Sequence, residues 1–323
     1  MQTRLRYDPR HTPIKACAMS IERYQYNIYC IDTDYVAAGI ACAYLVGDDE
    51  HYALIETGTG PSVEAMCDRI LSMGIDLQQI TAIIPTHAHL DHAGAAGHWM
   101  QLLPAATLCC HPVAARHLIN PEKLEASARA VYGSAFDALY GELIPVPAAR
   151  VRTLEHNEVY TLGHRDLRCV HLRGHAKHHL CLWDETSRGW FTGDTFGICY
   201  SELQSGEWPI ALPATTPTQF EPAWYIDSVK TIASSQPDWI YPTHFGRIPF
   251  DQRTAEQLIR QIEQYAEISP SCEPHAKIED ITKQALLTCL DETAVAAAVD
   301  RLQADIALNA QGVGYRLATL RSN

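Results

Sequence analysis

The sequence predicts an α/β protein in which one large mixed domain is followed by a helical appendage. Up to about residue 250, apolar runs typical of strands alternate with segments of helical periodicity, and beyond it the pattern is helical only. The chain has 323 residues, 47% of them hydrophobic, which is enough to fill the core of one large α/β domain. We therefore expect a domain over residues 1–250 and a helical extension over residues 251–323.

The first expected elements are strands. They lie in the runs NIYCIDTDY, GIACAYLVGDDEHYALIETG and QITAIIPT, where β-branched and aromatic residues cluster and GDDE marks a turn. A helix is expected ahead of the last run, because Val63, Met66, Ile70 and Leu71 recur at helical spacing and Gly74 suits a helix end.

The pattern continues through the rest of the chain. Strands are expected in ATLCCHP, VYTLGHRDLRCVHLRG, HLCLWDE, GWFTGD and DWIYPTH, and helices in WYIDSVKTIASS, DQRTAEQLIRQIEQYAEI, KIEDITKQALLTCL and DETAVAAAVDRLQADIALNAQG. Residues 121–141 are expected to form a helical insertion. Its apolar and aromatic residues lie at helical spacings, namely Leu124, Val131, Tyr132, Phe136, Leu139 and Tyr140. We expect the insertion and the extension to cover the mouth of the site described next.

Chemistry-bearing residues concentrate in the stretch PTHAHLDHAGAAGHW, residues 85–99. His87 and His89 are two apart, so both side chains project to one side if the backbone is extended. A helix is expected from the small-residue run at 94–97, so a turn separates this pair from Asp91 and His92. Imidazole and carboxylate groups suit borderline metals such as zinc, iron and manganese. The stretch therefore predicts half of a two-metal site.

Further ligands are expected where strands end. His175, Asp194 and His244 each follow an expected strand, and sites in α/β sheets gather at strand ends. With Asp194 as a bridging carboxylate, two ligand shells are complete. One consists of His87, His89 and His175, and the other of Asp91, His92 and His244.

With these motifs in this order, the sequence resembles the metallo-β-lactamase-fold hydrolase superfamily over about residues 25–248. GDTFG and the helical extension are similar to the type II glyoxalase branch. The resemblance implies an αββα four-layer sandwich with two divalent transition-metal ions at one sheet edge, zinc first and iron or manganese as alternatives. It also implies hydrolysis by a metal-bridging hydroxide, which the catalytic residue Asp91 would orient.

Departures from subgroup patterns narrow the chemistry. Asp194 stands where zinc β-lactamases with a bridging-site cysteine have that cysteine, His89 where flavodiiron proteins have glutamate, and Gly197 where signal lactonases have tyrosine. Hydrolysis of lactams, reduction of oxygen and hydrolysis of signal lactones are therefore disfavoured as the reaction of this protein. Glu56 replaces the usual aspartate and His179 keeps the place of a family histidine, so both are expected to hold ligands by hydrogen bonds.

The expected substrate is a small acyl-thioester or related ester, because thioesters react readily with hydroxide and leave as thiolates of low pKa. Tyr200 and Arg247 are candidate substrate contacts. Two alternatives stay open. One is a metal-containing ligand-binding or regulatory protein with low turnover. The other is a persulfide dioxygenase with a single iron on His87, His175 and Asp194.

Charge and composition limit the partners. The net charge of −13 and the pI of about 5.6 disfavour a nucleic-acid surface. No signal-peptide core or membrane-length apolar run is present, and the eleven cysteines contain no C-x-x-C pair. We therefore expect a cytoplasmic protein with a small-molecule substrate and neither nucleic-acid nor membrane partners, and a homodimer stays open.

Overall fold

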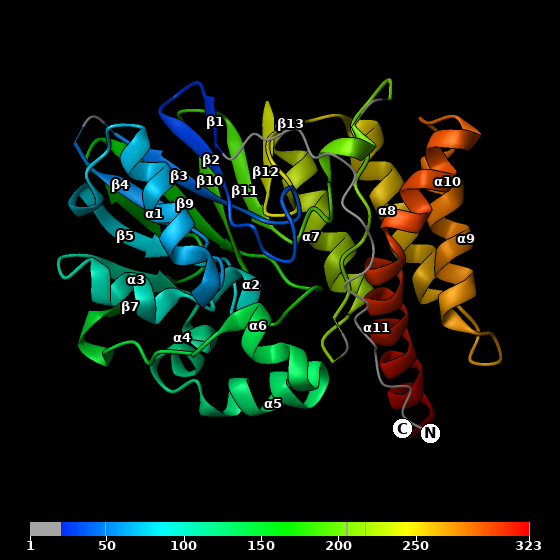
Figure 1. Ribbon diagram of the computed structural model, residues 1–323. Coiled ribbons are helices and arrows are strands. Elements are labelled where there is room, and N and C mark those ends of the chain that lie inside the picture. The colour runs from blue at the N-terminus through cyan, green and yellow to red at the C-terminus, as the bar shows by residue number, and fades with distance from the viewer. Residues whose placement is uncertain (1–20, 49, 205, 217, 323) are drawn as a thin grey trace. The chain divides into compact units, whose positions relative to one another are not determined.

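The computed structural model describes residues 21–48, 50–204, 206–216 and 218–322 (Figure 1). Contacts between Cα atoms divide the chain into two compact units. Unit 1 holds the described residues up to Leu154 together with Thr161–Arg165, and unit 2 holds Glu155–Tyr160 and the described residues from Asp166 onward. The expected boundary at residue 250 lies inside unit 2 and stays a prediction.

Unit 1 contains a seven-stranded sheet with the strands in chain order, β1 to β7 (Figure 1). The strands are β1 Ile21–Tyr24, β2 Ile28–Asp32, β3 Cys42–Gly47, β4 Tyr52–Ile55, β5 Ile80–Ile84, β6 Thr107–Cys110 and β7 Val151–Thr153. Strands β1 to β4 are antiparallel neighbours, whereas β4 to β7 run parallel. Because parallel strands end at the same edge of a sheet, the residues after β4 and β5 are brought to one edge.

The parallel strands of unit 1 are joined by helical crossovers. These are α1 Val63–Ser72, α2 Leu90–Ala93, α3 Ala96–Leu102, α4 Pro112–Ile119, α5 Glu122–Tyr132 and α6 Phe136–Tyr140. The insertion expected over residues 121–141 is therefore helical, as α5 and α6 with a short 3-10 turn between them. Strands β1 and β7 and helix α4 were not expected from the sequence.

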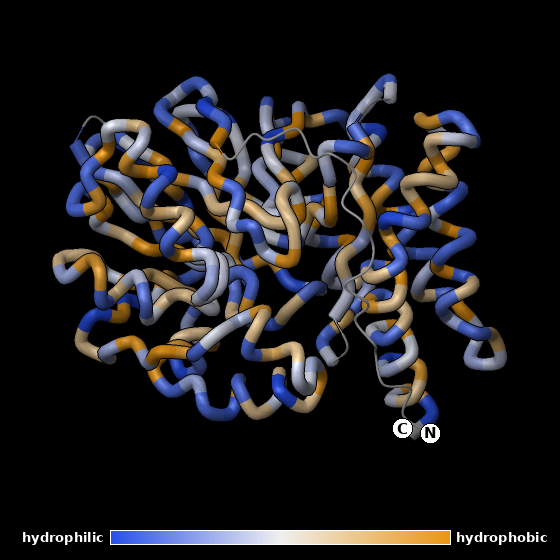
Figure 2. The backbone as a smooth tube through the Cα atoms, in the orientation of Figure 1, coloured by the Kyte–Doolittle hydropathy of each residue, from blue (hydrophilic) through white to orange (hydrophobic). Residues whose placement is uncertain are grey.

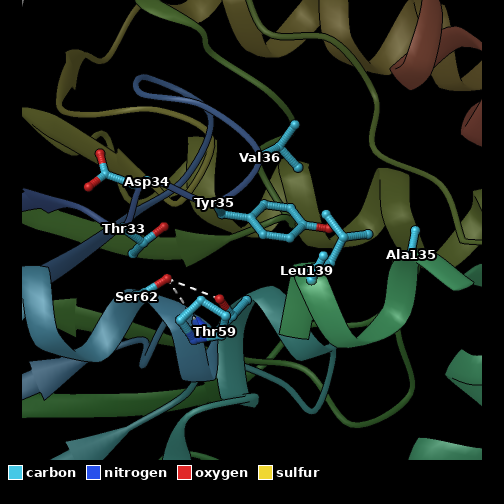
Figure 3. A pocket seen from close by; sticks show the side chains of 10 residues that line it. Thr33, Asp34, Tyr35, Val36, Thr59, Ser62, Ala135 and Leu139 are labelled. Carbon is cyan, nitrogen blue, oxygen red and sulfur yellow. Dashed lines mark hydrogen bonds between the residues drawn. The ribbon is translucent and has the colours of Figure 1, made fainter. Parts of the chain in front are cut away.

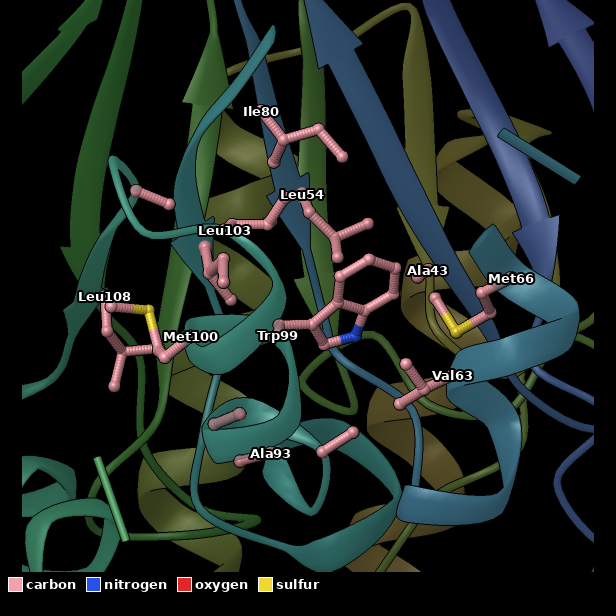
Figure 4. Packing of buried hydrophobic residues seen from close by; sticks show 14 of the residues in the cluster. Ala43, Leu54, Val63, Met66, Ile80, Ala93, Trp99, Met100, Leu103 and Leu108 are labelled. Carbon is pink, nitrogen blue, oxygen red and sulfur yellow. The ribbon is translucent and has the colours of Figure 1, made fainter. Parts of the chain in front are cut away.

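The core of unit 1 is built around the fully buried indole of Trp99 on α3 (Figure 4). Val63 and Met66 from α1 and Leu54 from β4 pack around this ring in the same apolar cluster. The indole Nε1–H donates to the backbone oxygen of Thr57 at 3.0 Å, so the polar edge of the ring is satisfied as well. Trp99 therefore connects the core to the turn after β4.

The second sheet has six strands in the order β13-β12-β11-β10-β9-β8. Its strands are β8 Val159–Leu162, β9 Arg165–His171, β10 Leu180–Asp184, β11 Gly189–Gly193, β12 Trp239–Pro242 and β13 Ile248–Pro249. Strand β10 is antiparallel to both β9 and β11, and β11 is parallel to β12 through the crossover helix α7 Pro222–Ser234. Strands β9, β11 and β12 thus point the same way, so the residues after them meet at one edge.

The extension is helical, as expected. It consists of α8 Gln252–Ala266, α9 Pro274–Leu286, α10 Glu292–Arg301 and α11 Gln303–Ser322. Helix α8 packs on α7, and α9 lies against α8, α10 and α11 (Figure 1). Hydrophilic and hydrophobic residues alternate along these helices (Figure 2). The single helix expected over residues 291–312 is instead two, with a break at Leu302.

None of the helices that the structure describes combines the length and the apolar composition needed to cross a membrane. The described cysteines are free thiols, and most of them are buried.

Replacing Trp99 by alanine should lower the midpoint of urea unfolding, because loss of a buried tryptophan costs about 3–5 kcal/mol. Leu102→Ala on the same helix is the matched control, since Leu102 is 45% exposed and its loss should leave the midpoint nearly unchanged. Circular dichroism during urea titration measures both variants. Equal midpoints for the two would show that Trp99 is not central to the core.

Candidate metal centre

In unit 1 the candidate ligands follow strand β5. Residues 86–89 form a bend, and His89, with extended backbone angles of φ −68° and ψ 152°, is the N-cap of α2. Asp91 and His92 lie inside that helix. The bend therefore contains the first ligand pair, and the chain becomes helical between the two pairs, at Leu90, before the small-residue run that was expected to start the helix.

The ligand atoms of unit 1 form two pairs. His87 Nε2 lies 2.7 Å from His89 Nδ1, and their ring centroids are 4.3 Å apart. His92 Nε2 lies 3.5 Å from Asp91 Oδ2. The His87 and His92 rings are also in contact, with centroids 4.0 Å apart. The structure thus brings all four predicted residues of this motif together, with the two pairs side by side.

The buried carboxylate of Glu56, just after β4, orients this cluster. It accepts hydrogen bonds from the backbone N–H of Thr86 at 2.9 Å and from the Thr86 hydroxyl at 2.6 Å. Its Oε1 also lies 2.9 Å from His92 Nδ1. With Nδ1 donating to Glu56, the Nε2 atom of His92 is the one that can serve as a ligand. The expected role of Glu56 in holding a metal ligand stays a prediction.

In unit 2 the carboxylate of Asp194 lies between two histidines. Its Oδ2 is 3.2 Å from His175 Nε2, and its Oδ1 is 3.5 Å from His244 Nε2. Asp194 follows β11, His175 follows β9 and His244 follows β12, which are the three strands that end at one edge. Each carboxylate oxygen therefore faces a different imidazole, the arrangement that a bridging ligand requires.

Neighbouring side chains hold these ligands in place. His175 Nδ1 lies 2.9 Å from the carbonyl oxygen of Ala214, which leaves Nε2 directed at Asp194. His179, which is fully buried, accepts from the Asp194 backbone N–H at 3.3 Å through Nε2. Its Nδ1 lies 3.2 Å from the Thr195 hydroxyl. The expected role of His179 in holding a metal ligand stays a prediction.

Tyr225 on α7 is a supporting residue that the sequence did not reveal. Its hydroxyl donates to the Asp194 carbonyl at 2.8 Å and accepts from the Ala214 backbone N–H at 3.3 Å. Burial raises the pKa of this phenol, so it stays protonated and able to donate. Its backbone also fills the space where a Cβ at Gly174 would lie, at 2.3 Å. From the sequence, Tyr225 is placed only within the helix expected over WYIDSVKTIASS.

The extension reaches the loop that follows Asp194. Asn309 on α11 is buried, accepts from the Thr215 backbone N–H at 2.7 Å and donates to the Pro213 carbonyl at 2.8 Å. The Tyr200 hydroxyl donates to Asp305 at 3.2 Å, and the Tyr200 ring lies 6.4 Å from the His244 ring. Helix α11 therefore braces the loop beside His244 and His175.

Of the two candidate substrate contacts, Tyr200 is buried and Arg247 is half-buried. The Arg247 guanidinium lies over the Trp239 ring, 3.9 Å from its centroid.

In unit 1 the helical insertion packs beside Asp91. Phe136 and Tyr140 are buried in one cluster with Leu90, and Tyr132 packs against them. Burial, together with the charge of Asp91, raises the pKa of the Tyr132 and Tyr140 phenols, so both stay protonated. Val131, another apolar residue of the insertion, is 45% exposed.

The chemistry of these donors fits divalent transition metals. Imidazole nitrogens and carboxylate oxygens, without a thiolate among the predicted ligands, suit zinc, iron and manganese alike. In both units the second ring nitrogen of a histidine, His92 or His175, is held by a carboxylate or a carbonyl oxygen. This is the usual outer support of metal-binding histidines.

A family model described as the metallo-beta-lactamase superfamily matches residues 38–244, which is more than half of the chain and includes every predicted ligand. The chain belongs to this superfamily. The α/β fold class and the family expected from the sequence are thereby confirmed, with two sheets, their helices and a helical extension.

Two relatives of known sequence are similar to this chain. The metallo-beta-lactamase fold-containing protein ST1585 of Sulfurisphaera tokodaii is 24% identical over 69% of this chain and 78% of its own. An acyl-coenzyme A thioesterase of Gallus gallus, MBLAC2, is 29% identical over 34% of this chain and 40% of its own. The latter match thus covers less than half of either protein.

Solved structures agree on the fold. The crystal structure of ST1585 superposes with a TM-score of 0.63 and 21% identity over 90% of this chain and 99% of that one. The family protein TTHA1429 of Thermus thermophilus gives a TM-score of 0.57 and 18% identity over 86% and 92% of the two chains.

Tyr225→Phe should weaken zinc binding by about tenfold or more, because outer supporting groups of this kind are worth about 10–100-fold in metal affinity. The change removes one hydroxyl and keeps the ring that packs beside Gly174. Tyr315→Phe removes the hydroxyl of a tyrosine that is 52% exposed and should leave the affinity unchanged. Competition with a chromophoric chelator measures both, and equal affinities would contradict the supporting role.

Proposed function

We propose that this protein is a dinuclear metal-dependent hydrolase of small acyl-thioesters. One ion would be held by His87, His89, His175 and Asp194, and the second by Asp91, His92 and His244. The second oxygen of Asp194 would complete the second set. The proposed ligands come from both units, and the family match spans all of them.

The observation that carries this proposal is the carboxylate of Asp194. Its two oxygens face two different imidazoles, His175 at 3.2 Å and His244 at 3.5 Å, so one carboxylate can serve two ions. The ligands of unit 1 are likewise divided, with His87 and His89 in one pair and Asp91 and His92 in the other. A site for a single ion would use only one of the two pairs of unit 1, His87 with His89 or Asp91 with His92.

Two divalent ions, when bound, would supply a hydroxide at neutral pH, because they lower the pKa of bound water toward about 7. The residues of this chain have other tasks. Glu56 holds the His92 ring, and Tyr225 holds the backbone at Asp194. The Asp91 carboxylate would accept a hydrogen bond from the attacking hydroxide and so orient it. No side-chain nucleophile is required.

Several features support a thioester as substrate. The thiol released from a thioester has a low pKa and leaves as a thiolate, so the reaction needs no strong general acid. Asp194 takes the place of the cysteine of zinc β-lactamases, and one relative is named as an acyl-coenzyme A thioesterase. Arg247 and Tyr200 are proposed to contact the polar part of the substrate. Zinc is the first choice of metal.

Purified wild-type protein supplied with zinc should hold close to two ions per chain. His87→Ala and Asp194→Ala should each lower the metal content and abolish activity, because each removes a proposed ligand. His164→Ala and Asp227→Ala, which change residues of the same types away from the proposed ligands, are the matched controls and should behave as wild type. Metal analysis of dialysed protein measures this, and a well-folded wild type with one ion or none would refute the dinuclear site.

Matched thioester, lactone and phosphodiester panels should show the highest kcat/KM for the thioesters. The comparison uses zinc-loaded wild type, with Asp91→Asn as the variant expected to lose at least about 100-fold in kcat. A lactone or phosphodiester preferred by about 100-fold, equivalent to about 2.7 kcal/mol of transition-state discrimination, would refute the thioester while leaving the metal site intact. Oxygen uptake with a persulfide would instead identify a dioxygenase.

A further inference from the structure

A cavity of about 380 Å³ lies in unit 1 between the β2–β3 loop, the turn after β4 and the helical insertion (Figure 3). Its apolar wall includes Tyr35 and Val36 from the loop and Ala138 and Leu139 from α6. Figure 3 shows Tyr35 and Leu139 among the side chains that line the cavity. The volume is at the lower end of the range of about 300–1,000 Å³ typical of small-molecule pockets.

The inner end of the cavity is polar. Three buried hydroxyl residues line it, Thr33, Thr59 and Ser62. Thr59 and Ser62 are hydrogen-bonded to each other, with 3.0 Å between their side-chain oxygens, and the Thr33 hydroxyl donates to the Ala41 carbonyl at 2.9 Å. Because these hydroxyl residues are buried and already hydrogen-bonded within the protein, they form a closed end that a hydrocarbon chain cannot extend beyond. The cavity therefore suits a chain of limited length.

The charge of the cavity favours an uncharged occupant. Asp34 is the charged residue in its described lining, and its carboxylate is paired with Arg69 at 2.6 Å. Within the described residues that line the cavity there is no lysine or arginine to bind a phosphate or carboxylate.

The cavity shares its structural elements with the candidate ligands of unit 1. The turn that carries Thr59 and Ser62 begins at Glu56, which holds His92, and the Thr57 hydroxyl donates to the His92 carbonyl at 3.0 Å. On the opposite wall the Tyr35 hydroxyl is 2.8 Å from the Tyr140 hydroxyl. Tyr140 in turn belongs to the apolar cluster that contains Leu90, the neighbour of Asp91. The cavity wall is therefore linked to the segment of Asp91 through the Tyr35–Tyr140 pair and the apolar cluster around Leu90.

We propose that this cavity binds the distal part of the acyl chain of the substrate and selects chains of medium length. The inference rests on the thioesterase function proposed above, and it adds the class of acyl group. The apolar wall contacts the methylene groups, and the hydroxyls of Thr33, Thr59 and Ser62 limit the depth.

Binding of the free carboxylate products tests the cavity without any turnover. The probes are acetate, butanoate, hexanoate, octanoate and dodecanoate, measured by calorimetry on zinc-loaded protein. Each methylene group that enters the cavity should tighten binding by up to about fourfold. The affinity should therefore rise along the series and fall again at dodecanoate. An affinity that does not depend on chain length would overturn the proposal.

Two variants connect the chain-length profile to the cavity. Ala138 is an exposed residue of α6 that lines the cavity, and Ala138→Phe should fill the cavity. The variant should lower the affinity for the best chain at least tenfold and leave the affinity for acetate unchanged. Leu139→Ala enlarges it and should move the optimum to a longer chain. Val131→Phe, a change to the same residue type on the exposed face of the same insertion, is the matched control and should keep the wild-type profile.

The outcomes separate this inference from the proposed function. If thioesters are cleaved but Ala138→Phe keeps the wild-type profile in both binding and kcat/KM, the cavity proposal is wrong and the thioesterase stands. If no thioester is cleaved but the carboxylate series follows the cavity variants, the cavity binds acyl chains and the proposed reaction is wrong.

Discussion

The buried carboxylate of Glu56 is the constraint on which the histidine cluster of unit 1 depends. A charge at this depth is tolerated only when its oxygens are hydrogen-bonded, and Thr86 and His92 supply those bonds. The same contacts fix the bend after β5 and the tautomer of His92. Removing one partner would leave the others buried without compensation, so the segment has little freedom to adopt another arrangement.

In unit 2 the candidate ligands are oriented by a different set of contacts. The three candidate ligands follow strands that point the same way, and their orientation comes from side chains outside those strands. Tyr225 holds the carbonyl of Asp194 and the N–H of Ala214, and the Ala214 carbonyl in turn holds His175. Asn309 of the extension holds the adjacent loop through Thr215. The extension is therefore part of the support of the site, in addition to its packing on α7 and α8.

The sequence predicted the parts of the site whose signal is local. His87, His89, Asp91 and His92 could be identified because a strand followed by a turn leaves few geometries for four such residues. His175, Asp194 and His244 could be identified because each follows an apolar run with strand character. Tyr225 and Asn309 could not, since each lies inside a helix whose periodicity explains it as a buried position. The break at Leu302 was missed because helical spacing does not show where one helix ends and the next begins.

The sequence by itself therefore determined the α/β class, the superfamily and the identity of the candidate ligands, because these depend on residue type and short-range spacing. The tertiary structure decided which nitrogen of His92 and of His175 is left for a metal, which oxygen of Asp194 faces which imidazole, and where a cavity remains beside the insertion. These features depend on contacts between residues far apart in the chain, such as Glu56 with His92 and Tyr225 with Asp194. The spacing of residues along the sequence does not reveal such contacts, because they form only when helices and strands that are far apart in the chain pack together.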